Sequence, residues 1–294
     1  MSTLDLRPLS IGELLDRTFS LYRRNFLLFI GISAIPHLLV LAFQLAQLAF
    51  TSTRFPVVPS RGTDFQAFPA RFSTSGVAGL VVLFILGVII WFISYLFSQG
   101  GTVFAVSELY LGRTTTVGRS LGRVRGELLS LFFVVFFNLL VIGFSFLFLI
   151  FPAIYMACRL CVCVPAALLE NLGPIDALQR SFKLTQDNAG RAFLILFLFV
   201  MIQYAAIFLF DMPFLIAIGL QAAAHDPSMV RLLTALMQVG NFVASVLVTP
   251  VLTIASSIFY FDLRVRKEAF DLQMMMNPLD VGVPSPRTAT TLLS

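Results

Sequence analysis

Charged residues are scarce in this chain. Asp, Glu, Lys and Arg make up 12% of its 294 residues, whereas an ordinary soluble domain carries about 25%. Hydrophobic residues make up 58%, 32 residues are Phe, and the mean hydropathy is +0.92. Such a chain has too few polar side chains to cover a surface that faces water. The composition therefore excludes an ordinary soluble domain and indicates a protein that lies in lipid.

Histidine and cysteine are also rare, with two His and three Cys. That supply excludes most metal centres and His-based mechanisms, as well as a disulfide framework. The sequence contains no Gly-rich phosphate loop, no GxSxG and no H-E-x-x-H. We therefore expect no catalytic residues, no metal site and no cofactor. The three cysteines, Cys158, Cys161 and Cys163, fall in an apolar segment and are interpreted as small buried thiols.

Six apolar stretches predict an all-α fold, a polytopic membrane bundle of about six transmembrane helices. A spanning helix needs about 20 mostly apolar residues. The spans are expected at about 26–50, 77–97, 128–148, 153–169, 192–210 and 232–259. About 25 largely polar residues precede the first span, so it is expected to stay in the membrane rather than to be a cleaved signal. Residues 1–267 are expected to form a single integral membrane domain, and residues 268–294, which contain three prolines, a disordered cytoplasmic tail.

Two places in this topology depend on local detail. The stretch 153–169 is short, carries Arg159 and follows the third span with only Phe151-Pro152 as a turn. The alternative interpretation makes this stretch a re-entrant segment. In the fifth span, Asp211-Met212-Pro213 is expected to end the helix at the outer face.

The distribution of basic residues predicts the orientation. With six spans, 15 of the 20 Lys and Arg residues fall in the segments on the side of the two termini, and four fall on the other side. The positive-inside rule then places both termini in the cytoplasm of a multi-pass cell-membrane protein. The net charge of +5 needs no nucleic acid to explain it. The expected partners are membrane lipids, with anionic headgroups at the cytoplasmic face, and an unidentified membrane protein.

Short amphipathic segments precede the odd-numbered spans. In residues 10–24 the apolar side chains share one helical face, and Ser10 with Glu13 matches a capping box. Residues 13–21 align with residues 176–184, and Pro174 suits the first turn of the second copy. A weaker third copy lies at 119–121. These copies predict a repeated unit, an interfacial amphipathic helix followed by a helical hairpin.

The same segments resemble a known family. The runs Leu6 to Phe26, Val164 to Glu170 and Gly173 to Ser181 are similar to the bacterial glycerophosphoryl diester phosphodiesterase membrane-domain family, and the resemblance covers roughly residues 6–267. The family takes its name from chains that fuse this membrane region to a catalytic barrel. This sequence has no stretch long enough for the roughly 250 residues of such a barrel. The resemblance therefore implies a membrane domain of unassigned role and not the phosphodiesterase activity.

Five residues are candidates for a binding role. Ionisable residues inside spans are costly and suggest function, which points to His37, Arg159 and Glu170. Each of the three could instead have a purely structural role. Glu170 would then pair with a cytoplasmic Arg, and the Arg159 side chain would extend outward to the membrane surface. His37 would form a hydrogen bond to a neighbouring helix beside a kink at the proline. Arg17 and Arg180 occupy matching positions of the repeat, where each can bind a lipid phosphate or a carboxylate such as that of Glu170.

These features favour a non-catalytic integral membrane protein, a scaffold, accessory subunit or lipid-organising protein. The alternative is a transporter or channel for a small molecule or lipid that uses the polar residues inside its spans. A lipid-modifying enzyme is the least favoured class, because no paired acids or His residues face the membrane surface. A closed bundle would support the first class, and a polar cavity lined by Arg159 and His37 would support the second.

Overall fold

The computed structural model describes residues 9–54, 74–224 and 227–268, and these ranges fold into helices without any strand. The helices are α1 (Ile11–Arg24), α2 (Phe26–Arg54), α4 (Thr74–Tyr110), α5 (Val117–Phe148), α6 (Ile150–Leu160), α7 (Cys163–Glu170), α8 (Pro174–Thr185), α9 (Ala189–Ala224) and α10 (Pro227–Glu268). Six stretches are long and apolar enough to cross a membrane: Phe26–Thr51, Ala78–Tyr110, Val117–Phe148, Ile150–Glu170, Ala189–Gln221 and Ser228–Glu268. The predicted fold class is confirmed.

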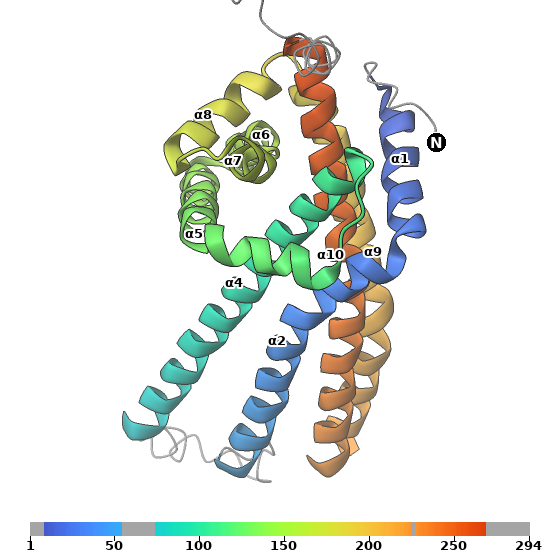
Figure 1. Cartoon of the computed structure of the whole chain (residues 1–294). Helices are drawn as coiled ribbons and strands as arrows, with labels where there is room; N and C mark the ends of the chain where they lie inside the picture. The colour runs from blue at the N-terminus through green and yellow to red at the C-terminus, as the bar shows by residue number, and fades with distance from the viewer. Residues whose placement is uncertain (1–8, 55–73, 225–226, 269–294) are drawn as a thin grey trace, which may run out of the picture.

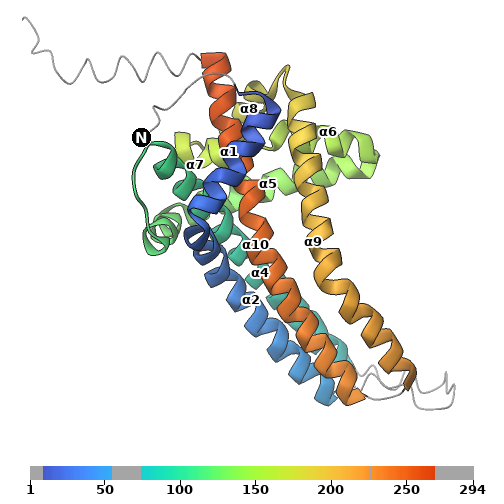
Figure 2. The same ribbon diagram turned by 90° about the vertical axis from the view of Figure 1, so that its right-hand side faces the viewer.

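Four long helices, α2, α4, α9 and α10, form the main bundle (Figures 1 and 2). Helix α10 packs against the other three and against α1. The helices α1, α7 and α8 and the last turns of α10 lie at one end of the bundle, which we call the basic end (Figure 1). Helix α10 has 42 residues, about 63 Å at 1.5 Å per residue, roughly twice the 30 Å of the hydrocarbon core. It is therefore long enough to carry charged residues beyond the lipid tails.

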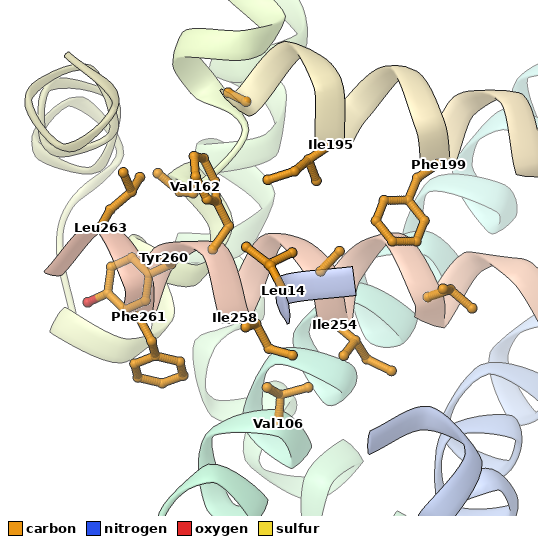
Figure 3. Close-up of a cluster of buried hydrophobic side chains, with 14 of the residues drawn as sticks. Leu14, Val106, Val162, Ile195, Phe199, Ile254, Ile258, Tyr260, Phe261 and Leu263 are labelled. Carbon is orange, nitrogen blue, oxygen red and sulfur yellow. The ribbon is translucent and has the colours of Figure 1, made fainter. Parts of the chain in front are cut away.

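The largest hydrophobic cluster surrounds α10 in the half of the bundle nearer the basic end (Figure 3). It is built from α1, α2, α4, α8, α9, α10 and the region around the junction between α6 and α7, and its members include Leu14, Val106, Val162, Ile195, Phe199, Ile254 and Ile258. Both ends of the described chain, Leu9 and the last turns of α10, are thus held in one core.

Two adjacent glycines let α4 pass close to its neighbours. A Cβ atom at Gly101 would lie 2.8 Å from the Ile32 side chain of α2 and 3.1 Å from the Leu121 side chain of α5. A Cβ at Gly100 would lie 3.0 Å from Val124 and from Leu131 of α5. Real Cβ atoms rarely approach so closely, so both positions require glycine for the observed packing.

We expect Gly101→Leu to destabilise the protein by about 1–3 kcal/mol or more, because overpacking forces α2 and α5 apart. Thermal unfolding in detergent measures the effect. Gly143 of α5 is the control, since a Cβ there meets nothing within 4 Å, and Gly143→Leu should leave the melting temperature unchanged or raise it, because Leu favours a helix more than Gly does. Equal melting temperatures for the two variants would contradict the close packing of α4.

The fourth predicted span is broken in the structure. Helix α6 ends at Leu160, and α7 begins at Cys163. Pro165, in the first turn of α7, has no N–H for the Cys161 carbonyl and its ring crowds that carbonyl, which favours a break at this point. The turn before α6 also differs from the prediction. It lies at Leu149, which is extended (φ 179°, ψ 165°), and not at Phe151-Pro152.

The second half of α5 and helix α6 form a hairpin that we call the arm. The arm leaves the main bundle sideways and does not run alongside the four long helices (Figures 1 and 2). Its tip is apolar and exposed, with Leu147 82% and Phe151 79% accessible. A hairpin that exposes large apolar side chains to this extent requires lipid or another protein around it.

The fifth predicted span does not end at Asp211-Met212-Pro213. Helix α9 continues to Ala224 with Pro213 inside it. Asp211 is buried and accepts a hydrogen bond at 3.3 Å from Nδ2 of Asn241 on α10. This partner on the neighbouring helix explains how an acidic residue fits within the helix.

The amphipathic helices α1 and α8 begin as predicted. The Ser10 hydroxyl accepts a hydrogen bond from the Glu13 N–H, and the Glu13 carboxylate accepts one from the Ser10 N–H, which completes the capping box. Pro174 occupies the first turn of α8. The buried residues of α1 face α10, and those of α8 face α5, α6 and α7. The weaker copy at 119–121 is part of the continuous helix α5, and the predicted tail lies outside the described residues except for Glu268.

Candidate functional site

A tight turn after α7 brings Glu170 and Arg180 together. Asn171 adopts the left-handed conformation (φ 52°), and the Leu172 N–H donates to the Ala167 carbonyl at 3.0 Å. This geometry ends a helix and reverses the chain, and Asn tolerates it better than most residues. Pro174 then starts α8, which folds back over α7 (Figure 1).

Glu170 is the centre of one group of polar side chains, which we call the Glu170 cluster: Glu170, Arg180, Tyr260, Arg264 and Glu268. Arg180 donates from Nε and Nη2 to the Glu170 carboxylate at 2.8–3.0 Å. The Tyr260 hydroxyl donates to the same carboxylate at 2.7 Å. Glu268 forms ion pairs with Arg180 and Arg264. The cluster joins α7, α8 and α10 and contains equal numbers of acids and arginines.

The charge of Arg180 is firmly maintained by this cluster. Partial burial lowers the pKa of its guanidinium, but the hydrogen bonds and charges of Glu170 and Glu268 outweigh burial and raise that pKa above its ordinary value. A forked guanidinium between two carboxylates is a strong, orientation-specific contact. Arg180 therefore binds carboxylates of the protein itself, those of Glu170 and Glu268.

A second group, the Asp262 cluster, consists of Asp262, Arg191, Arg266 and the backbone of Leu9. The Asp262 side chain is 0% exposed and accepts a hydrogen bond from the Leu9 N–H at 2.7 Å. Arg191 and Arg266 pair with this carboxylate at 3.1 and 3.0 Å. Both arginines also donate to the Leu9 carbonyl at 2.6 Å. The cluster attaches the segment before α1 to α9 and α10.

The other predicted site residues lie apart from these clusters. Arg17 of α1 donates a hydrogen bond to the Tyr110 hydroxyl at the end of α4. His37 Nδ1 lies 2.8 Å from the Ser33 carbonyl of its own helix. This bond lies within the helix of His37, in the turn that contains Pro36, and the described residues show no bond from His37 to a neighbouring helix.

Arg159 does not extend outward, as the structural alternative expected, but lies beside α8. It is in the last turn of α6, and its guanidinium lies over the Phe182 ring at 5.2 Å and the Tyr155 ring at 5.9 Å. The break between α6 and α7 turns the chain at this point, which brings Arg159 to α8. Of the five candidates, the structure brings together only Glu170 and Arg180.

Two pockets stand out in the described part of the chain. One, of about 300 Å³, lies beside the Glu170 cluster and is lined by Glu170, Leu172, Asp176, Gln179, Arg180 and Lys183. The other, of about 250 Å³, lies between α2 and α4 and includes Gln44, Phe84 and Trp91 in its lining. Neither pocket is lined by Arg159 or His37.

The two clusters act as ties between helices. Their carboxylates and guanidinium groups bind one another, so the strongest charges at the basic end hold α7, α8, α9 and α10 in place. Sequence reasoning missed most members, including Tyr260, Asp262 and Arg191. One signal was present: Tyr260 with Arg264, and Asp262 with Arg266, are four residues apart near the end of the last span, a spacing that places each pair on one helical face.

The chain was compared with known families, proteins and structures. No family model, curated protein or solved structure matches this chain.

Proposed function

We propose that this chain is a non-catalytic membrane protein that gathers anionic lipids at the cytoplasmic face of the cell membrane. One observation carries the proposal. Arg23, Arg24, Arg119 and Arg125 are exposed, and among the described residues none of them forms an ion pair. We call these four residues the basic belt.

The belt borders exposed apolar surface. Arg23 and Arg24 are separated only by Asn25 from Phe26 and Leu27, and both of those apolar side chains are exposed. Arg125 lies one helical turn before Leu129, which is exposed as well. Cations next to apolar surface suit the level of the lipid headgroups, where phosphates meet the acyl chains.

The basic end of the molecule also supports an orientation in the membrane. The described ends of the chain meet at the Asp262 cluster, and most of the described Lys and Arg residues belong to segments at that end (Figure 1). The positive-inside rule assigns such an end to the cytoplasm. The arm, with its exposed apolar tip, would then enter the cytoplasmic leaflet from the side, which is the re-entrant alternative for residues 153–169. The family resemblance is still a prediction and adds no support here.

A transporter is the second candidate, and Asp211 is the observation that favours it. Its carboxylate is buried between α9 and α10, and its Oδ1 atom has no hydrogen-bond partner within the described chain. An ionisable group in a membrane span is a common feature of ion and proton pathways. Neither pocket described above includes Asp211 in its lining, so the lipid-organising function is preferred.

The belt can be tested by removing its charges in pairs. We expect Arg23→Gln/Arg24→Gln and Arg119→Gln/Arg125→Gln to reduce retention of phosphatidylglycerol, because each cation near an anionic surface contributes about 1 kcal/mol, or about fivefold in affinity. Retained lipids are counted by mass spectrometry after purification in mild detergent with equal phosphatidylglycerol and phosphatidylcholine.

The matched control lies at the opposite end of the bundle. Arg54 at the end of α2 and Arg231 near the start of α10 are replaced together by Gln, which removes the same charge. This variant should keep the lipid composition of the unchanged protein. Equal phosphatidylglycerol retention in the belt variants and the unchanged protein would overturn the proposed function.

A further inference from the structure

Arg159 differs from the other arginines that lie against the core. Its Nε atom is buried and has no hydrogen-bond partner, and the described residues provide no carboxylate for it. Its counterparts at the basic end are paired with acids: Arg180, Arg191, Arg264 and Arg266. Among the described residues, Arg159 thus carries a positive charge without an acidic partner.

The structure nevertheless fixes the position of this residue. The Ser181 and Thr185 hydroxyls of α8 donate to the Arg159 carbonyl at 2.8 and 3.0 Å. The rings of Phe182 and Tyr155 lie beside the guanidinium. Aromatic faces attract a cation, but they do not accept the in-plane N–H groups. An acceptor is therefore missing at the edge of the guanidinium.

An anion is the group that completes such a site. A guanidinium nitrogen buried without an acceptor is unfavourable, and an arginine inside a membrane protein is normally paired. Its planar fork matches the oxygens of a phosphate, which can accept two parallel hydrogen bonds. The chemistry at Arg159 therefore indicates a phosphate group.

The surroundings indicate that this phosphate belongs to a lipid. Tyr155 and Phe151 precede Arg159 by about one and two helical turns, and both are exposed, as is Ile154 between them. They form an apolar stripe that leads from Arg159 toward the tip of the arm. A free phosphate ion has no apolar part that could contact this stripe, whereas the acyl chain of a lipid can lie along it.

We propose that Arg159 and this stripe bind one anionic phospholipid, with its phosphate on the guanidinium and an acyl chain along the arm. The site rests on the proposed function, because it needs the arm to lie in the lipid at headgroup level. The proposed site adds one specific lipid position to that function, and this position is separate from the four arginines of the basic belt.

The first experiment counts tightly bound lipid on the intact protein by native mass spectrometry, with phosphatidylglycerol as the probe. We expect Arg159→Met to lower occupancy of the most tightly held lipid about tenfold. Arg159→Lys should bind with intermediate affinity, because it keeps the charge but loses the fork. The belt variant Arg119→Gln/Arg125→Gln should lose loosely held lipids and keep the tight one. The two proposals therefore fail separately: unchanged occupancy in Arg159→Met overturns this site, and unchanged loose binding in the belt variant overturns the proposed function.

The second experiment separates binding from folding. In lipid-free detergent Arg159→Met should melt at the same temperature as the unchanged protein or higher, since it removes an uncompensated charge. Added phosphatidylglycerol should raise the melting temperature of the unchanged protein and not that of the variant. Phe182→Leu, which keeps the charge, should show a reduced response to the lipid.

Two further results, from the melting experiment, would overturn the site. One is a lower melting temperature for Arg159→Met that is the same with and without phosphatidylglycerol, which would show a purely structural arginine. The other is stabilisation by inorganic phosphate alone equal to that by the lipid, which would show that the apolar stripe takes no part. Failure of inorganic phosphate to displace the tightly bound lipid supports the lipid assignment.

Discussion

Replacing Asp262 by Ala is expected to destabilise the protein by about 3–5 kcal/mol, because removal of one partner from a buried ion pair leaves uncompensated charge behind. The Leu9 N–H would lose its acceptor, and Arg191 and Arg266 would lose their shared carboxylate and keep only the Leu9 carbonyl. Asp262→Asn should cost less, since an amide oxygen can still accept from Leu9. Unfolding can be followed in detergent with a thiol-reactive dye, because the free thiols Cys158 and Cys163 are buried in the folded protein.

The control for this prediction is Asp16→Ala. Asp16 is an exposed acid on α1, and its loss should change the melting temperature little. If Asp262→Ala melted like Asp16→Ala, the tie between Leu9, α9 and α10 would not hold the fold together.

The second large effect is expected at Glu170. Glu170→Ala should cost about 2–4 kcal/mol, because Arg180 and Tyr260 lose the acceptor that both share. The side chains of Glu170 and Arg180 are 18% and 23% exposed, so solvent weakens the pair only in part. Unfolding of Glu170→Ala, Arg180→Ala and the double variant, followed with the same thiol dye, gives the coupling energy between the two residues.

We expect that coupling to exceed about 1 kcal/mol. The surface pair Arg123 and Glu108 provides the comparison, since Arg123 is 58% exposed and such pairs contribute about 0–1 kcal/mol. A coupling for Glu170 and Arg180 no larger than that of the surface pair would mean that the cluster does not stabilise the fold.

The helices could be predicted from the sequence, and so could the pairing of Glu170 with an arginine. Long apolar runs identify membrane helices because lipid allows few other structures. The capping box at Ser10 depends on residues three positions apart, so it could be recognised locally. The pairing of Glu170 with a cytoplasmic-side arginine was one of the predicted outcomes, since the two residues are only ten positions apart.

The features that were missed depend on distant parts of the chain. Asp262 binds a backbone group 253 positions away, and no local pattern in either segment predicts that contact. Asp211 was assigned to a helix end from the nearby Pro213, and its partner Asn241 lies on a different helix, which the local sequence does not reveal. The exposed position of the arm likewise follows from how α6, α8 and α9 pack, which hydropathy does not specify.

The contact between Leu9 and Asp262 also constrains the order in which the protein can assemble. During synthesis Leu9 leaves the ribosome long before Asp262, so the N-terminal segment waits until nearly all of the described chain has been made. During that interval α10 does not yet cover Leu14. The apolar face of α1 must then bind the membrane surface. Contacts between distant residues form late and slowly, so among the described helices the last one made, α10, is also the one that fixes α1 in place.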